Sequence, residues 1–102
     1  MNTNTYPIMI AVNGNEVYSV TAKTATDEAA MLKKYGTVKE ATEVRIGDDS
    51  YVIAPDGKIY GGYHSQYRGN GITLHGWNLH GFEKTAPAVK VKLVAMRCKL
   101  YG

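Results

Sequence analysis

Side chains that can hold anions, move protons and stack on rings are concentrated in the second half of this chain. The histidines His64, His75 and His80 all lie there, as does the single tryptophan, Trp77. Tyrosines and an arginine accompany them within residues 60–82. Histidine exchanges protons near neutral pH, arginine forks onto phosphate or carboxylate groups, and aromatic rings stack on bases. These residue types predict a recognition surface for an anionic partner.

Charge is distributed unevenly along the chain. Residues 1–56 carry five Lys and Arg against eight Asp and Glu, a balance of −3. Residues 57–102 carry seven against one, a balance of +6, and the two balances sum to the net charge of +3. A basic segment of this kind suits a nucleic acid, a nucleoprotein complex or an anionic protein surface.

A second group of candidate residues lies near the C-terminus, where residues 89–100 predict a long strand. Apolar side chains alternate there, and a one-residue bulge near residues 94–95 would bring them onto one face. The same bulge would gather four cations into a basic stripe on the other face: Lys90, Lys92, Arg97 and Lys99. The alternative interpretation is an edge strand that uses lysine to prevent unwanted strand pairing.

We predict that the basic stripe and the aromatic segment form one contact zone. Phosphate contacts would supply affinity, and stacked rings would supply fit. For any single ring, burial in the core is the simpler interpretation, because most large aromatic side chains are buried. The candidate binding residues are Tyr60, Tyr63, His64, Tyr67, Arg68, His75, Trp77, His80, Lys90, Lys92, Arg97 and Lys99.

No motif in the chain identifies a reaction. Neither Ser65 nor Cys98 has the sequence surroundings of a nucleophile, and the glycines form no phosphate-binding or dinucleotide fingerprint. The spacings of His and Cys match no zinc pattern, so we expect no metal and no cofactor. Histidine with tyrosine, arginine and lysine is nevertheless the equipment of metal-independent ribonucleases. That activity stays open, with His64, His75 or His80 as the acid or base.

Local patterns near the N-terminus predict the first elements that must position these side chains. Residues 6–12 and 16–22 are rich in Ile, Val and Tyr and flank an Asn-Gly pair, which predicts a tight β-hairpin. Thr24 has a carboxylate three residues later and predicts the N-cap of a helix over residues 25–35. Gly36 marks its end.

Turn sequences divide the middle of the chain into short strands. Residues 43–46, 50–54 and 58–60 predict a β-meander, because Asp-Asp and Pro-Asp-Gly sequences separate them. Residues 61–71 predict a long glycine-rich loop, whereas residues 37–42 fit either a short helix or irregular structure.

A short repeat follows this loop. The pattern Leu-His-Gly-aromatic-polar occurs at residues 74–78 and again at 79–83. Because five residues match neither the period of a strand nor that of a helix, we expect a bend at Gly76 or Gly81.

The predicted fold is a single α+β domain over residues 1–102. It consists of a small antiparallel sheet with the helix packed on one face. The N-terminal hairpin, the meander and the long C-terminal strand form this sheet. A chain of 102 residues suits one domain. Hydrophobic residues make up 44% and charged residues 21%, close to the averages of globular proteins.

The expected location is the cytoplasm, without membrane contact. The longest early apolar run, residues 8–12, is too short for a signal peptide or a membrane span. Cys98 is the single cysteine and has no partner for an internal disulfide, which fits a reducing compartment.

The hairpin followed by a Thr-led helix with Asp27, Glu28 and Ala29 resembles the ββα arrangement of arm-binding domains in phage integrases. The resemblance covers about the first third of the chain and carries no residue role across. In character, a short aromatic-rich domain without motifs is similar to accessory proteins of phages and mobile elements, including anti-CRISPR inhibitors. The basic half argues against inhibitors that imitate DNA by being strongly acidic.

We therefore expect a small non-catalytic binding protein that engages a nucleic acid or a nucleoprotein complex. One alternative is a binder of protein or of a small anionic nucleotide, with ligand sites at the seams of an oligomer. The other is the metal-independent ribonuclease. The oligomeric state stays open, as does whether the basic stripe and the aromatic segment share one face.

Overall fold

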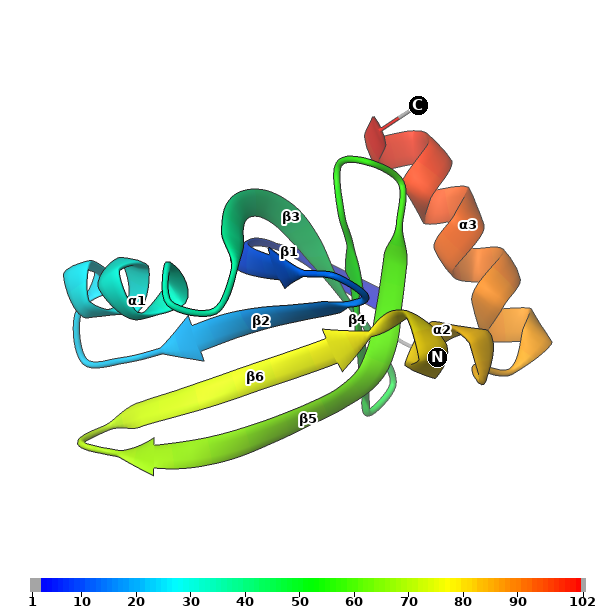
Figure 1. Cartoon of the computed structure of the whole chain (residues 1–102). Helices are drawn as coiled ribbons and strands as arrows, with labels where there is room; N and C mark the ends of the chain where they lie inside the picture. Colours follow the sequence, from blue (N-terminus) through cyan, green and yellow to red (C-terminus); the bar gives the residue numbers. More distant parts are fainter. Residues whose placement is uncertain (1–2, 102) are drawn as a thin grey trace.

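The computed structural model describes residues 3–101, which form a closed barrel of six antiparallel strands with helices packed against its outside (Figure 1). Around the barrel the strands follow the order β1-β2-β6-β5-β4-β3, and β3 returns to β1. In chain order the elements are β1 (Thr3–Asn13), β2 (Glu16–Thr21), α1 (Ala25–Leu32), β3 (Thr37–Ile46), β4 (Asp49–Ile53), β5 (Ile59–Gly69), β6 (Ile72–Asn78), α2 (Leu79–Glu83) and α3 (Pro87–Tyr101).

The predicted N-terminal hairpin is present, but its two strands soon separate. Gly14 takes the positive φ that the turn requires, at 61°. Strand β1 pairs with β2 through three residue pairs, from Ala11 to Asn13. It then follows β3 in an unbroken register from Val12 to Thr3. This departure of β1 from its hairpin partner allows the sheet to close.

The predicted helix is also present as α1, although it ends at Leu32. Thr24 caps it as expected, because the Thr24 hydroxyl accepts a hydrogen bond from the Asp27 N–H at 3.1 Å. Gly36 follows the turn after the helix, and its Cα faces the backbone of Val12 so closely that a Cβ would lie 2.3 Å from the Val12 carbonyl oxygen. The chain must therefore leave the helical conformation before it reaches Gly36.

The predicted meander is confirmed as β3, β4 and the start of β5, whereas the predicted glycine-rich loop is wrong. Strand β5 continues to Gly69 and turns through Asn70 and Gly71, both at positive φ, into β6. An Asn-Gly pair between extended segments is a hairpin signal. Gly62, at φ 63°, lies in a bulge of β5.

The predicted C-terminal strand is wrong, because residues 87–101 form helix α3. Pro87 occupies the first helical position, where its missing N–H has no cost. The side chains that face the barrel recur at spacings of four and three residues, the helical period. They are Val89, Leu93 and Met96. This period explains the apolar pattern without the bulge that a strand would need.

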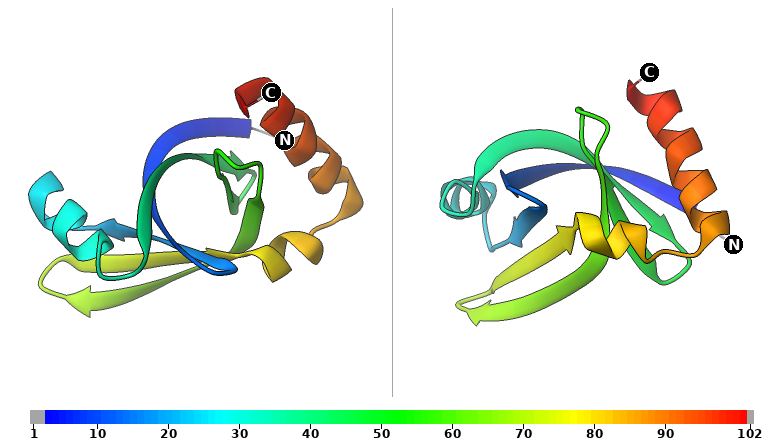
Figure 2. Two further views of the ribbon diagram at one scale, coloured as in Figure 1. Left: turned by 45° about the horizontal axis from the view of Figure 1, so that its top comes forward. Right: turned by 45° about the vertical axis from the view of Figure 1, so that its right-hand side comes forward.

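The expected open sheet with one helix on its face is therefore corrected to a closed barrel with three helices outside it in residues 3–101. The mixture of helices and strands was expected correctly. Figure 2 shows α1 and α3 on different sides of the barrel. Within the same residues, no helix is both long enough and apolar enough to cross a membrane.

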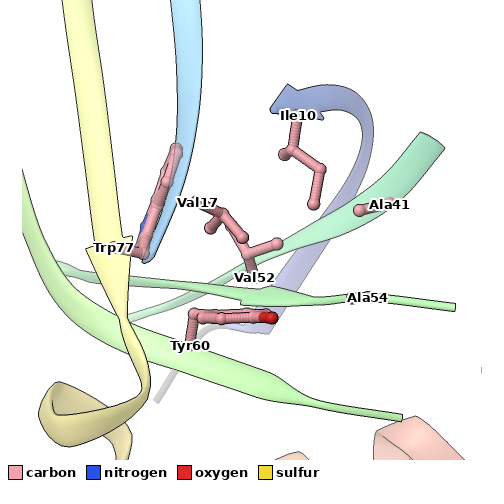
Figure 3. Packing of buried hydrophobic residues seen from close by; sticks show 7 residues of the cluster. All are labelled: Ile10, Val17, Ala41, Val52, Ala54, Tyr60 and Trp77. Atoms are coloured by element: carbon pink, nitrogen blue, oxygen red, sulfur yellow. The ribbon is translucent and has the colours of Figure 1, made fainter. Parts of the chain in front are cut away.

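Apolar side chains pack inside the barrel and under each long helix. The interior cluster, shown in Figure 3, comprises Ile10, Val17, Ala41, Val52, Ala54, Tyr60 and Trp77. Leu93 of α3 packs on the outward residues Val44, Ile46, Tyr51, Ile53 and Ile59. Leu32 of α1 packs on Ala11, Val20 and Leu74. A strand that is buried on both faces needs apolar residues at successive positions. The sequence provides such a run at residues 51–54, in and directly after β4.

Candidate functional site

One region of the barrel interior is lined by polar side chains and remains open as a cavity of about 150 Å³. It arises from the two-residue period of the strands. On β2 the buried Val17 is followed on the same face by Ser19 and Thr21, and on β3 Ala41 is followed by Glu43 and Arg45. We call this cavity the barrel mouth. Its lining residues are Ile8, Ser19, Thr21, Glu43, Arg45, Tyr63, His75 and Trp77.

Glu43 is a buried carboxylate, 9% exposed, held in place by its neighbours. Its Oε2 accepts hydrogen bonds from the Arg45 Nε at 3.0 Å and from the Ser50 hydroxyl at 2.7 Å. The indole N–H of Trp77 in turn donates to the Ser50 oxygen at 3.2 Å. Both of these hydrogen bonds use Oε2, and no hydrogen bond to Oε1 is present among residues 3–101. The charge of Arg45 compensates that of the carboxylate.

Arg45 lies between the carboxylate and an exposed ring. Its guanidinium carbon is 4.8 Å from the centroid of the Tyr6 ring, a cation–π distance. The hydrogen bond and the charge of Glu43 raise the pKa of Arg45. The guanidinium therefore stays charged, and because its side chain is 55% exposed, it can offer further N–H donors to an anion.

His75 is held by a hydroxyl on each side of its ring. Its Nε2 lies 2.8 Å from the Thr21 hydroxyl oxygen, and its Nδ1 lies 2.8 Å from the Tyr63 hydroxyl oxygen. Burial lowers the pKa of His75, against a smaller raising effect of the Glu43 charge. The neutral imidazole that results accepts one of these hydrogen bonds and donates the other.

Aromatic rings continue from the mouth along the inner face of β5. The Tyr63 ring is stacked with the His75 ring at a centroid distance of 5.9 Å and lies 5.3 Å from the Trp77 ring. Strand register places Ser65 opposite His75, and Tyr67 follows on the same face. Tyr63 is 43% exposed and Tyr67 is 67% exposed. We call Tyr63, Ser65 and Tyr67 the inner strip of β5.

The structure brings some of the predicted site residues together and separates others. Tyr63, His75 and Trp77 meet at the mouth, and Tyr67 extends the inner strip. Tyr60 instead lies in the interior cluster (Figure 3). Its side chain has no exposed surface. Its hydroxyl has no hydrogen-bond partner among the described residues.

His64 and Arg68 alternate with the inner strip and therefore point to the outer face of the β5–β6 hairpin. The His64 ring lies against Gly76 of β6, which has no side chain to obstruct it. His80 belongs to α2, where its ring Nδ1 is 3.7 Å from a carboxylate oxygen of Glu83. Neither His64 nor His80 contributes to the mouth.

The four cations of the predicted basic stripe do not form one. On a helix, residues seven apart share a face, so Lys90 lies above Arg97 and Lys92 lies above Lys99 on nearly opposite sides of α3. Arg97 donates a hydrogen bond to the Gly57 carbonyl oxygen at 3.2 Å. The Lys90 ammonium lies 5.9 Å from the centroid of the Phe82 ring in α2. The expected stripe depended on a strand that does not exist.

Sequence reasoning missed Ile8 and four polar residues of the mouth, namely Ser19, Thr21, Glu43 and Arg45. A signal for the polar residues was present, because each of them follows a buried apolar residue, Val17 on β2 or Ala41 on β3, on the barrel-facing side of its strand. A polar residue on such a face marks the place where a core opens to solvent or to a ligand.

Within residues 3–101, no group of three or more His, Cys, Asp or Glu side chains is placed to hold a metal ion. Comparisons of this chain with protein-family models, with curated proteins and with solved structures found no match. The geometry of the mouth is therefore the observation from which a function can be inferred.

Proposed function

We propose that this protein binds single-stranded nucleic acid without cleaving it, with one base at the barrel mouth and its neighbours along the inner strip of β5. The observation that carries this proposal is the cavity of about 150 Å³ in which an exposed tyrosine ring, an arginine and a histidine meet. The mouth is small and open to solvent, so a flat ring could enter it from outside and lie against Tyr63. The open ends of β-barrels are also common ligand sites.

The chemistry of the lining residues supports the same ligand class. Tyr63 and Tyr67 present ring faces on which bases stack without sequence preference. Arg45 presents a guanidinium to a phosphate, and the free oxygen of Glu43 can accept an N–H from a base. Such a strand can be free or part of a nucleoprotein complex. The latter fits an accessory or inhibitor protein of a phage or mobile element that acts in the cytoplasm.

The four cations of the predicted basic stripe do not share one face, so few cations are available to contact phosphates. This limits the electrostatic contribution to the binding affinity. Arg45 lies at the mouth, and the Lys23 side chain lies against Gly71 at the tip of the β5–β6 hairpin, whereas Arg68 points to the outer face, away from the inner strip. Each phosphate contact to a single strand contributes about −0.7 to the slope of log affinity against log salt. Two contacts, at Arg45 and Lys23, predict a slope of about −1.4.

The test is a fluorescence-anisotropy titration with labelled single-stranded oligonucleotides at several salt concentrations. Tyr63→Ala should weaken binding about 5-fold to 150-fold, since one stacked base contributes ~1–3 kcal/mol. Tyr63→Phe keeps the ring and should stay within a few fold of the parent protein. Lys92→Ala, on the exposed side of α3, should have no effect. Binding that ignores salt, or no binding at low salt, would refute the proposal.

A mononucleotide ligand is the competing outcome of this experiment. In that case thermal stability would rise with a free nucleotide and would not respond to oligonucleotides. The same titration series, read by thermal unfolding, separates the two ligand classes.

Ribonuclease activity is the second candidate, because a carboxylate and an imidazole share the mouth with Arg45. Glu43 and His75 would be the acid and base in such a reaction. A labelled RNA that stays intact after prolonged incubation with the purified protein would remove this candidate. Cleavage lost in both Glu43→Gln and His75→Asn, with folding retained, would establish it.

A further inference from the structure

We propose that the free edge of β5 pairs with the same edge of a second copy of this chain, giving a two-fold dimer with a continuous antiparallel sheet. This dimer is a separate property from nucleic-acid binding, and it can be tested without any ligand.

One side of β5 is paired along most of its length, and the other is not. Strand β6 pairs with β5 from Gly61 to Gly69, with irregularities at both ends. On the opposite side, β4 pairs with β5 at Ile59 and Tyr60. From Tyr63 to Arg68 that side has no strand partner within residues 3–101, and all six residues are exposed. Figures 1 and 2 show no other element beside this part of β5.

An unpaired edge of this kind presents alternating N–H and C=O groups to any extended chain. Natural proteins usually block such edges with proline, lysine or a covering element. Among residues 3–101, strand β1 also has a stretch without a partner on its β2 side, and this stretch carries Pro7, which lacks an N–H donor. The β5 edge from Tyr63 to Tyr67 carries neither proline nor lysine.

The sequence favours one register of self-pairing, with the two-fold axis at Ser65. In that register Tyr63 lies opposite Tyr67 of the second copy, and His64 lies opposite Gln66 of the second copy. Arg68 then lies opposite Gly62 of the second copy, at the end of the paired stretch. Aromatic cross-strand pairs stabilise antiparallel sheets, and like charges directly opposite each other destabilise them.

The neighbouring registers that keep both inner faces on one side are worse. An axis at Gln66 would place His64 opposite Arg68, so that protonation of the imidazole would create a repulsive pair. An axis at His64 would place that ring opposite itself and would move the paired stretch toward residues 60–62, where β4 and α2 already cover β5. The axis at Ser65 avoids both problems.

The dimer would also join the two inner strips. Residues directly opposite each other in an antiparallel pair point to the same side of the sheet. Tyr63 and Tyr67 of both copies would therefore form two cross-strand pairs of rings on one face of the sheet, and each pair would lie next to one barrel mouth. A nucleic-acid strand of sufficient length could then contact both mouths.

Disulfide trapping tests the register. Ser65→Cys in a Cys98→Ser background places the two introduced thiols on opposite residues, whose Cα atoms are ~4.5–5.5 Å apart in an antiparallel pair. This distance lies within the range that a disulfide spans. The matched control is Gln66→Cys in the same background. Its two copies are displaced by two residues, ~6.8 Å along the strand and ~5 Å across, so their Cα atoms are ~8 Å apart and too distant.

We expect Ser65→Cys to give a cross-linked dimer under mild oxidation and Gln66→Cys to stay monomeric. Equal cross-linking of both, or of neither, would overturn the proposal. Sedimentation of the unmodified protein supplies a second measurement, in which a dimer is expected. Ser65→Lys places two cations opposite each other and should shift it to monomer, whereas Thr5→Lys on the Pro7-bearing edge should not. A monomer at the highest soluble concentration, or a dimer that Ser65→Lys leaves intact, would equally count against it.

Discussion

Removal of the buried hydroxyl of Tyr60 should stabilise this protein. The ring lies inside the barrel with no exposed surface, and its hydroxyl has no hydrogen-bond partner among residues 3–101. Burial also raises the pKa of Tyr60, which agrees with a poorly solvated oxygen. A buried polar group without a partner costs about 1–3 kcal/mol. Tyr60→Phe removes that cost and leaves a void of about one oxygen atom, which offsets part of the gain.

We therefore expect Tyr60→Phe to raise the free energy of unfolding by about 1 kcal/mol, equivalent to ~4–8 °C in Tm for a domain of this size. Urea unfolding measures it, and an unchanged m-value would show that the transition itself is the same. Tyr101→Phe is the control, since it removes a hydroxyl that lies 3.0 Å from the Thr42 hydroxyl oxygen. It should lower stability by up to ~1 kcal/mol. If Tyr60→Phe lowered stability by a similar amount, the Tyr60 hydroxyl would have a partner and the reasoning would be wrong.

Two further predictions concern the glycine contacts and the pH dependence. Gly81→Ala would place a Cβ 2.3 Å from the backbone nitrogen of Gly62, so we expect a loss of several kcal/mol or an unfolded chain, as read by circular dichroism. Gly76→Ala meets the exposed His64 ring, which can move, so its loss in the same urea assay should be smaller; equal losses would contradict this explanation. The pKa of His75 is lowered below 6.5, so its contribution to stability is present above that pH and is lost on acidification, because the unfolded chain binds the proton more readily. His75→Asn should flatten this acid limb, and an NMR titration that gave His75 a pKa above 6.5 would reject the prediction.

Elements with local signals were predictable from the sequence, whereas the closure of the barrel was not. The Asn-Gly turn and the Thr24 cap act within a few residues, so the first hairpin and α1 were found. The pairing of β1 with β3 joins residues 3–12 to residues 37–46, and nothing near β1 shows that it will leave β2. The C-terminal error has another cause: the valines and alternating lysines of this segment fit a strand, while Val89, Leu93 and Met96 also fit the helical period, so the sequence pattern is ambiguous.

The candidate site followed the same division. Tyr63, His75 and Trp77 were found by residue type, because ring-bearing and titratable side chains stand out in a glycine-rich segment. Glu43 and Arg45 come from the acidic half, and they meet His75 only after β3 and β6 have become walls of one barrel. Residue type along the sequence therefore located three of the eight lining residues of the mouth.

The order of strands around the barrel has a consequence for how the chain folds. The seam between β2 and β6 joins residues separated by more than half of the sequence, from Glu16 with Asn78 to Thr21 with Thr73. Until β6 has been synthesised, β2 lacks its β6 partner and the β5–β6 hairpin cannot form. Val17 and its neighbours then have no opposite side of the barrel to pack against. Long-range pairing of this kind slows folding, because the entropy of closing the loop is lost before the contacts form. A ribosome-bound chain that ends before β6 should therefore remain sensitive to proteases.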